Sequence, residues 1–252
     1  MRRTIAICAV FVLVVAGAVV GLRLRDAGAP SRSGLVAKRN PTPRPTPTAA
    51  PTPEPTATPL PAQVMNQVPY TPQAPFDNWD AAHEHYCTAA DTLMVEDFYK
   101  GDRESVIPPA VADQQMGAII ARDRQVWPGV LSLPLASVAQ TAQAMFGLTP
   151  TIEPVTLANV ERALAGGHPV LVALMTHGDP GGAAIAPYYG SDNVHHVILL
   201  IGYDATRNVV YANDPGFMQG RDYTYSWSTL TPAIAQESPR YDPSQEMLYF
   251  TG

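Results

Sequence analysis

The sequence predicts an α+β domain in which N-terminal helices pack on a mainly antiparallel sheet. Apolar residues recur at helical spacing between residues 87 and 165, whereas short runs rich in valine and leucine follow from residue 169 onwards. Helices followed by strands, without regular alternation, are typical of a segregated α+β domain. Neither an internal repeat nor a second linker interrupts residues 67–250, so we treat residues 63–252 as one domain.

The first predicted helix begins at Cys87 and ends before Gly101, because glycine is a common helix terminator. A later helix is bounded by Thr156, which can cap its first turn, and by Gly166 and Gly167. The apolar stripe of the first helix consists of Ala89, Ala90, Leu93, Met94 and Phe98. The helices predicted after it span residues 113–121, 134–147 and 157–165.

Apolar runs too short for helices predict four strands, at residues 169–175, 196–203, 208–214 and 247–252. The second and third of these strands are joined by a polar turn. If this turn pairs Tyr203 with Val209, the same register extends to the far ends of both strands. Asp214 then pairs with Ile198 and lies diagonally across from His196 on the same face. A slip of one residue would separate the two side chains.

Residues 4–22 form an uncharged apolar run of 19 residues. A helix of this length spans about 28 Å, close to the thickness of a bilayer core. A cleaved signal peptide is the alternative, because Arg2 and Arg3 precede the run and residues 27–29 form a small-residue cleavage site. That site lies beyond several charged residues, which favours an uncleaved anchor. Residues 1–25 are therefore predicted to be a transmembrane anchor or a signal sequence.

Residues 26–62 are predicted to form a stalk. Nine prolines interleaved with threonines lie between Pro41 and Pro61, which favours polyproline II and excludes a packed core. A stalk after an anchor suggests that the following domain is extracytoplasmic. Residues 1–62 carry eight basic and two acidic side chains, whereas residues 63–252 carry eight basic and twenty acidic ones, a balance of −12. This acidic balance speaks against nucleic acid as a partner.

Cys87 is the only cysteine of the predicted domain, since Cys8 lies in the apolar run. An exported thiol without a disulfide partner is either reactive or buried as an inert core residue. At the first turn of a helix, free N–H groups and the helix dipole favour a thiolate. Cys87 is therefore a candidate nucleophile, and a structural core cysteine is the alternative.

A cysteine hydrolase also needs an imidazole base, a group that orients this imidazole, and donors for the developing oxyanion. His196 opens the strongest predicted strand, and its neighbour His195 points to the opposite face. Asp214 is positioned to orient His196, with a purely local turn as the alternative. Gln73, upstream of the nucleophile, is a candidate oxyanion donor, and a surface loop residue is the alternative.

The remaining histidines carry weaker signals. His168 and His177 flank a predicted strand, where ordinary polar residues are common. His83 and His85 together with His195 would offer a zinc site, but the His-Glu-His spacing lacks the four-residue separation of the H-E-x-x-H motif. We therefore expect no metal and no cofactor.

Five segments, taken in order, resemble those of a known family: VPYTPQAPFDNW, HEHYCTAADTLM, GGHPVLVAL, HHVILLIGYD and VVYANDPG. Together they resemble peptidase C-39-like domains, which are papain-fold relatives of the double-glycine leader peptidases of bacteriocin exporters. The resemblance runs from Val68 to Gly216. It implies a papain-like cysteine peptidase fold and a catalytic set in which Cys87 is the nucleophile, His196 the base, Asp214 its orienting group and Gln73 the oxyanion donor.

The chain departs from the family pattern at Thr88 and Ala89, where acidic residues often follow the cysteine. Residues 178–194 form a long connection whose Tyr188 and Tyr189 suggest a lid or a substrate loop. We expect an extracytoplasmic, membrane-tethered cysteine peptidase-like hydrolase that acts on a peptide or related acyl bond. Its expected partners are a peptide or protein substrate and, through the N-terminal helix, a membrane. A binding module of the same fold without turnover is the main alternative, and a zinc hydrolase is a third.

Overall fold

The central strands are apolar on both faces because helices cover both faces. The structure, a computed structural model, describes residues 59–102, 104–178, 182–237 and 245–252. All six residues of β3 (Val170–Met175) and nine of the ten residues of β4 (His195–Asp204) are buried. Within the described residues, one seven-stranded sheet has the order β2-β7-β3-β4-β5-β6, with β1 beside β4 and every pair antiparallel. The other strands are β1 (Gln63–Met65), β2 (Thr149–Pro154), β5 (Val209–Asn213), β6 (Tyr223–Ser226) and β7 (Glu246–Thr251).

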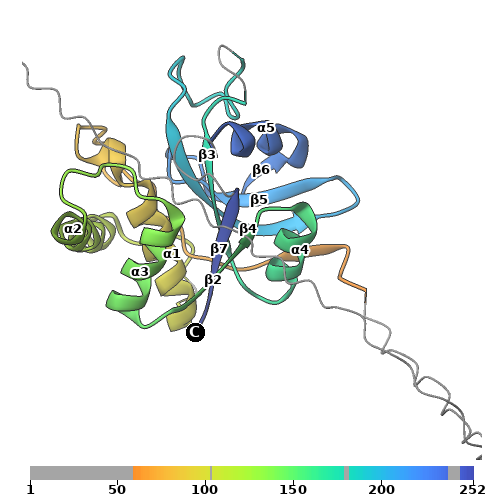
Figure 1. Cartoon of the computed structure of the whole chain (residues 1–252), viewed down its shortest axis with the longest axis horizontal. Coiled ribbons are helices and arrows are strands. Elements are labelled where there is room, and N and C mark those ends of the chain that lie inside the picture. The colour runs from red at the N-terminus through yellow and green to blue at the C-terminus, as the bar shows by residue number, and fades with distance from the viewer. Residues whose placement is uncertain (1–58, 103, 179–181, 238–244) are drawn as a thin grey trace, which may run out of the picture. The chain divides into compact units, whose positions relative to one another are not determined.

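The helices divide between the two faces of the sheet (Figure 1). One core joins odd-numbered residues of β3 and β4, such as Leu171 and Val197, to the first three helices. A second core joins even-numbered residues, such as Val172 and Ile198, to the other two helices. The first group is α1 (Cys87–Lys100), α2 (Pro109–Val126) and α3 (Leu135–Phe146), and the second is α4 (Leu157–Ala165) and α5 (Trp227–Glu237). The predicted α+β class is confirmed.

α1 is the most deeply buried helix, because all eleven residues from Cys87 to Asp97 are buried. It begins at the predicted residue and ends at Gly101, whose φ of 84° lets its N–H reach the carbonyls of the last turn. A short 3₁₀ turn, η1 (His83–His85), leads into it. α2 is longer than predicted at both ends, and its earlier start places Pro109 at the first position, where the missing N–H has no intrahelical partner to lose.

The register of β4 against β5 differs from the prediction at one end only. The predicted pairing of Tyr203 with Val209 is wrong, because Asp204 pairs with Val209. A β-bulge at Ile201 inserts one extra residue into β4 and shifts the register of its pairing with β5 by one residue. Beyond the bulge the pairs follow the predicted register, with Leu200 opposite Ala212 and Leu199 opposite Asn213.

Besides the short turn η1, four elements were not predicted from the sequence. β2 contains Pro150 and Pro154, and it lies at the edge of the sheet, where a missing N–H is tolerated. α5 contains Pro232, which breaks the helical pattern in the sequence. β1 and β6 have three and four residues, which is too short for a periodic pattern.

The anchor predicted at residues 1–25 and most of the stalk predicted at residues 26–62 lie outside the described residues. Within the described part of the chain, no helix combines the length and the apolar character that a membrane crossing requires.

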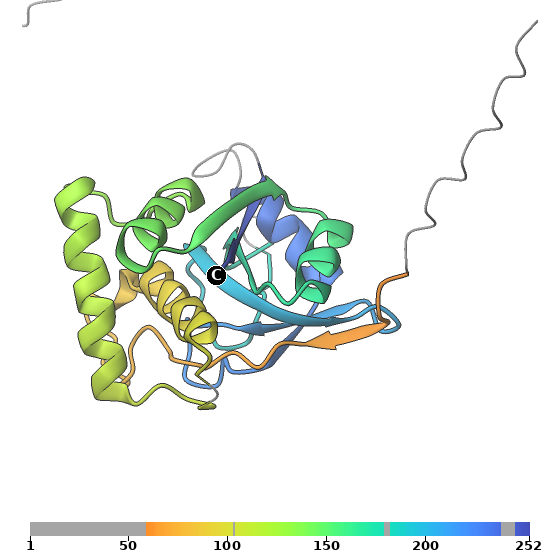
Figure 2. The ribbon, with the colours of Figure 1, turned by 90° about the horizontal axis from the view of Figure 1, so that it is seen from below.

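Two strands, β3 and β1, pair with successive segments of the same edge of β4. β3 pairs with residues 195–200, and β1 pairs with residues 202–204, so the first strand of the domain extends the same edge (Figure 2). Gly202 lies at this junction, and a Cβ there would be 2.4 Å from the carbonyl oxygen of Val64. The close approach of β1 therefore depends on the absence of a side chain.

We expect Gly202→Ala to lower the free energy of unfolding by about 1–3 kcal/mol, the usual cost of overpacking. Urea unfolding followed by circular dichroism measures the change. Gly117→Ala is the matched control, because nothing lies within 4 Å of a Cβ built on Gly117 inside α2. That control should be neutral or stabilising by about 1 kcal/mol. Equal stability of Gly202→Ala and the wild type would contradict the tight junction.

Candidate active site

Cys87 is the first residue of α1 and is 7% exposed. The preceding residue, Tyr86, places no side-chain acceptor on the first turn of the helix. The N–H groups of this turn have no intrahelical partners, and the helix dipole adds a partial positive charge. Cys87 therefore lies in the first turn of α1, the position that the sequence predicted.

His196 links Cys87 to Asp214. It is the second residue of β4 and is buried, and its Nε2 lies 2.8 Å from Asp214 Oδ1. The Cys87 side chain is its second hydrogen-bond partner. Because Nε2 is used by Asp214, Nδ1 is the ring nitrogen left for the sulfur. The three side chains thus form one chain of contacts from the helix end to the loop after β5.

Asp214 is fully buried and accepts hydrogen bonds from four groups. Besides His196, Tyr189 Oη lies 2.7 and 2.8 Å from its two carboxylate oxygens, Tyr225 Oη 2.5 Å from Oδ2, and the Gly216 N–H 2.9 Å from Oδ1. Burial alone would raise the pKa of Asp214, but the His196 charge and these donors lower it below its ordinary value. The carboxylate is therefore ionised.

The backbone around Asp214 is held as tightly as its side chain. The Tyr70 hydroxyl donates to the carbonyls of Asp214 and Phe217, at 3.1 and 2.5 Å. The Asp214 N–H donates to the carbonyl of Gly220 at 2.9 Å. A Cβ on Gly220 would overlap the carbonyl oxygen of Asp214, at 1.8 Å, so only glycine fits this return of the loop.

Gln73 lies on the loop before η1 and is buried. Its backbone N–H donates to the carbonyl of Pro215, at 2.9 Å, which ties the Gln73 loop to the Asp214 loop. Its side-chain Nε2 donates to the carbonyl of His83, at 2.7 Å. The second N–H of the same amide is left for another acceptor. Gln73 and His196 border the same cavity, so the amide and the imidazole face one space.

This cavity has a volume of about 560 Å³ and brings solvent to the candidate site. Trp79 and Tyr188 are exposed aromatic residues in its wall, with 39% and 51% of their surface accessible. Glu84 and Asp192 give the wall negative charge, and none of the described residues that line it is Lys or Arg. A space of this size with aromatic and acidic walls suits a peptide segment.

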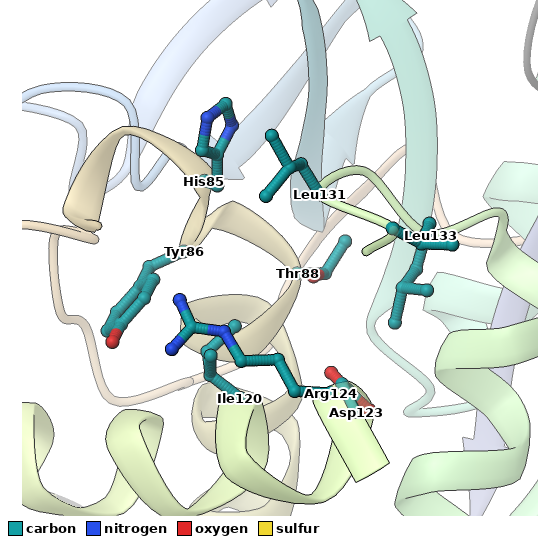
Figure 3. Close-up of a pocket in the computed structure, with 9 residues that line it drawn as sticks. His85, Tyr86, Thr88, Ile120, Asp123, Arg124, Leu131 and Leu133 are labelled. Atoms are coloured by element: carbon teal, nitrogen blue, oxygen red, sulfur yellow. The ribbon is translucent and has the colours of Figure 1, made fainter. Parts of the chain in front are cut away.

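A separate, smaller pocket lies on the α2 side of the start of α1 (Figure 3). Arg124 of α2 reaches toward this start, and Leu131 and Leu133 of the following loop close the opposite side (Figure 3). His85 borders both this pocket and the cavity. Neither Cys87 nor His196 lines the smaller pocket, so it is not part of the candidate active site.

Comparison with protein families decides the identity of this fold. The model of the Peptidase C39-like family matches residues 65–238, which is more than half of the chain. The chain belongs to the Peptidase C39-like family. The family match begins within β1 and ends beyond α5, so it extends past Gly216, where the resemblance of single segments stops.

Two solved structures are similar to this C39-like domain at low sequence identity. One, assigned as a C39-like peptidase of Bacillus anthracis, has a TM-score of 0.50 and 14% identity, and covers 75% of this chain and 98% of its own. Another, the cysteine protease xylellain of Xylella fastidiosa, has a TM-score of 0.37 and 13% identity, with coverage of 76% and 85%. No curated protein matches the sequence. The first structure agrees with the α+β papain-like fold predicted from the sequence.

The structure brings Cys87, His196 and Asp214 of the C39-like domain into contact, and Gln73 borders the same cavity as His196. Two other histidines, His168 and His177, hold structural contacts. His168 Nδ1 lies 3.0 Å from the Tyr99 hydroxyl. His177 lies between the carbonyls of Gly182 and Gly190, at 2.7 and 3.0 Å from its two ring nitrogens. Among the described residues, no three His, Cys, Asp or Glu side chains gather as a metal site.

Three contributors to the site of the C39-like domain were missed by sequence analysis. Tyr189 was assigned with Tyr188 to a lid or substrate loop, but its ring is packed against His196 and its hydroxyl binds Asp214. Tyr225 lies on the unpredicted strand β6. Asp91 lies one turn after Cys87 in α1, fully buried, and neither of its oxygens has a hydrogen-bond partner among the described residues. Burial and then the Cys87 charge raise the pKa of Asp91 well above its ordinary value, so it is protonated.

The charge on His196 makes stability depend on pH. Burial by itself lowers the pKa of His196, but the charge and hydrogen bond of Asp214, followed by those of Cys87, raise it from 6.5 to about 10. The native state therefore binds this proton more tightly than the unfolded state. The resulting stabilisation is complete below pH 6.5 and is lost as the pH rises toward 10.

We expect the urea concentration at the unfolding midpoint of the wild type to decrease as the pH is raised from 7 to 10. In His196→Gln this decrease should be smaller. The buried tyrosines also have raised pKa values and destabilise the native state when they ionise, but both proteins share this effect at the highest pH. The difference between the two proteins isolates His196. Parallel curves over the whole range would show that His196 is not charged in the folded state.

Proposed function

We propose that this C39-like domain is a cysteine peptidase that hydrolyses peptide or related acyl bonds through Cys87, His196 and Asp214. One observation carries the proposal: a buried imidazole is hydrogen-bonded to a helix-terminal thiol on one side and to an ionised, fully buried carboxylate on the other. This is the arrangement of nucleophile, base and orienting group that acyl transfer requires.

The proposed reaction has two steps. The Cys87 sulfur, as the thiolate, attacks the carbonyl carbon of the scissile bond, and the His196 imidazolium gives its proton to the leaving amine as the C–N bond breaks. A water molecule then attacks the thioester while His196 takes a proton from it, and the carboxylic acid leaves with the sulfur regenerated. The free N–H of the Gln73 amide and the backbone N–H of Cys87 are the proposed donors to the oxyanion.

We also propose that the domain is extracytoplasmic and tethered to a membrane. This part rests on the sequence alone, on the apolar run at residues 4–22 and the proline- and threonine-rich stretch that follows it. The substrate would then be a peptide or protein on the outer side of the membrane.

We expect Cys87→Ala to abolish hydrolysis of a mixed peptide library by the full chain in detergent, and Asp214→Asn to lower kcat by about 10²–10⁴-fold, because it misorients the imidazole.

We also expect iodoacetamide to modify Cys87 at pH 6 at least about tenfold faster in the wild type than in His196→Gln, because the charged ring holds the thiolate. Mass spectrometry of the Cys87 peptide separates it from Cys8.

His168→Gln is the matched control for this labelling, because its ring contacts Tyr99 and Tyr249 rather than the sulfur. It should leave the rate unchanged. If Cys87 reacts equally in the wild type and His196→Gln, and Cys87→Ala keeps the binding of peptides, the domain is a binding module rather than a peptidase.

The acidic wall of the cavity predicts a preference for basic peptides. Glu84 and Asp192 are exposed, and each charge pair with a substrate is worth about 1 kcal/mol at most, or roughly fivefold. We expect kcat/KM to be several-fold higher for peptides with lysine or arginine near the scissile bond than for the same peptides with glutamate. Glu84→Gln and 0.5 M salt should both reduce this preference. Glu104→Gln, an exposed acid outside the cavity, is the control, and an unchanged preference in Glu84→Gln would contradict the assignment.

A further inference from the structure

His83 holds two carboxylates at once. Its Nδ1 lies 2.8 Å from Asp80 Oδ1 and its Nε2 lies 2.8 Å from Asp113 Oδ1. A carboxylate only accepts hydrogen bonds, and a neutral imidazole has one N–H, so only the imidazolium satisfies both contacts. The Asn78 amide lies farther from the same ring, at 3.1 Å from Nδ1. The geometry is therefore that of a charged bridge.

This bridge joins two separate parts of the structure. Asp80 belongs to the loop that leads into η1, where its carboxylate also accepts the backbone N–H groups of Ala82 and His83. Asp113 lies near the start of α2. The His83 ring is almost buried between them, and the Tyr86 ring packs on it with centroids 4.8 Å apart. The bridge thus fixes the segment just before Cys87 against α2.

The main chain of the same residue holds Gln73. The His83 carbonyl accepts the hydrogen bond from Gln73 Nε2, at 2.7 Å, and the oxygen of the same side-chain amide, Gln73 Oε1, has no hydrogen-bond partner among the described residues. The orientation of the Gln73 side-chain amide is therefore set by this one hydrogen bond to the His83 carbonyl. A shift of the His83 carbonyl would turn the free N–H away from the oxyanion, and such donors are effective only over a narrow range of distances.

We propose that His83 is a positioning residue, whose charged bridge to Asp80 and Asp113 fixes the carbonyl that aims the Gln73 amide at the oxyanion. The proposal rests on the proposed function, because it gives Gln73 the role of an oxyanion donor. It adds a second histidine to the site, one that acts through the amide and does not touch the substrate. It also makes the oxyanion site sensitive to pH, because the bridge needs the proton on His83.

The direction of this sensitivity follows from the groups that face the ring. Burial lowers the pKa of His83, but the hydrogen bonds and charges of Asp113 and Asp80 raise it above its ordinary value. The facing groups are Asp80 from the loop, Asp113 from α2, and the uncharged Tyr86 ring and Asn78 amide. The bridge is therefore present at acidic and neutral pH and is lost as the pH rises through the raised pKa of His83.

Asp113→Asn is the cleanest test, because Asp113 is partly exposed, whereas Asp80 also caps η1. As the pH is raised, we expect the kcat of this variant to decrease at a lower pH than the kcat of the wild type. At pH 8 its kcat should be about five- to tenfold lower, with KM nearly unchanged, whereas at pH 5.5 the two proteins should agree. Glu104→Gln removes an equal charge elsewhere and should follow the wild type.

A double-mutant cycle separates positioning from a general loss of structure. In the Gln73→Ala background, Asp113→Asn should have no further effect on kcat, because its action passes through the amide. A full additional loss in that background, or a pH profile of Asp113→Asn that overlays the wild type, would overturn the proposal.

A readout independent of turnover is the pKa of His83 itself, followed by NMR of the histidine ring protons and assigned with His83→Gln. It should fall in Asp113→Asn, and an unchanged value would overturn the bridge. Cys87→Ala and Gln73→Ala in the same series identify where a failure lies. Activity retained by Cys87→Ala would overturn the proposed function, whereas full activity of Gln73→Ala beside inactive Cys87→Ala would overturn only the role of the amide.

Discussion

The ion pair between His196 and Asp214 is the constraint on which the candidate site depends. Both side chains are buried, and two charges taken out of water are stable only if their remaining hydrogen-bonding positions are filled. Tyr189, Tyr225 and the backbone of Gly216 fill them. The long connection before β4, the strand β6 and the loop after β5 therefore have to meet at one carboxylate, although Tyr189 of the connection is 25 residues away from Asp214 in the sequence.

This requirement gives the connection at residues 178–194 a structural role beside any role in substrate binding. Tyr189 is held by Asp214, while its neighbour Tyr188 is 51% exposed, lines the cavity and stacks on Phe217 with centroids 4.4 Å apart. A Cβ on Gly216 would lie 2.5 Å from the Tyr189 hydroxyl, so this packing leaves no room for a larger residue. A peptide that contacts Tyr188 therefore touches a segment that also contacts Asp214 and His196.

Local sequence signals were enough for the parts of the site that local structure positions. The start of α1 at Cys87 and the strand that begins near His196 follow from periodicity and stop signals. The alignment of Asp214 with His196 was predicted from a turn that pairs the wrong residues. The alignment is nevertheless correct, because the bulge at Ile201 shifts the register back to the predicted one. Neither the bulge nor Tyr225 could be predicted, because both depend on pairing between strands that no short pattern encodes.

The contrast between Asp214 and Asp91 shows how the fold sets the charge of the site. Both carboxyl groups are fully buried, and Asp91 is one helical turn from Cys87. Asp214 meets four donors and stays ionised, whereas Asp91 meets no donor from the described part of the chain and keeps its proton. A second negative charge at Asp91 would compete with Asp214 for the imidazolium and would oppose a thiolate on the sulfur. Because Asp91 keeps its proton, the Asp214 carboxylate is the one that holds His196 in line.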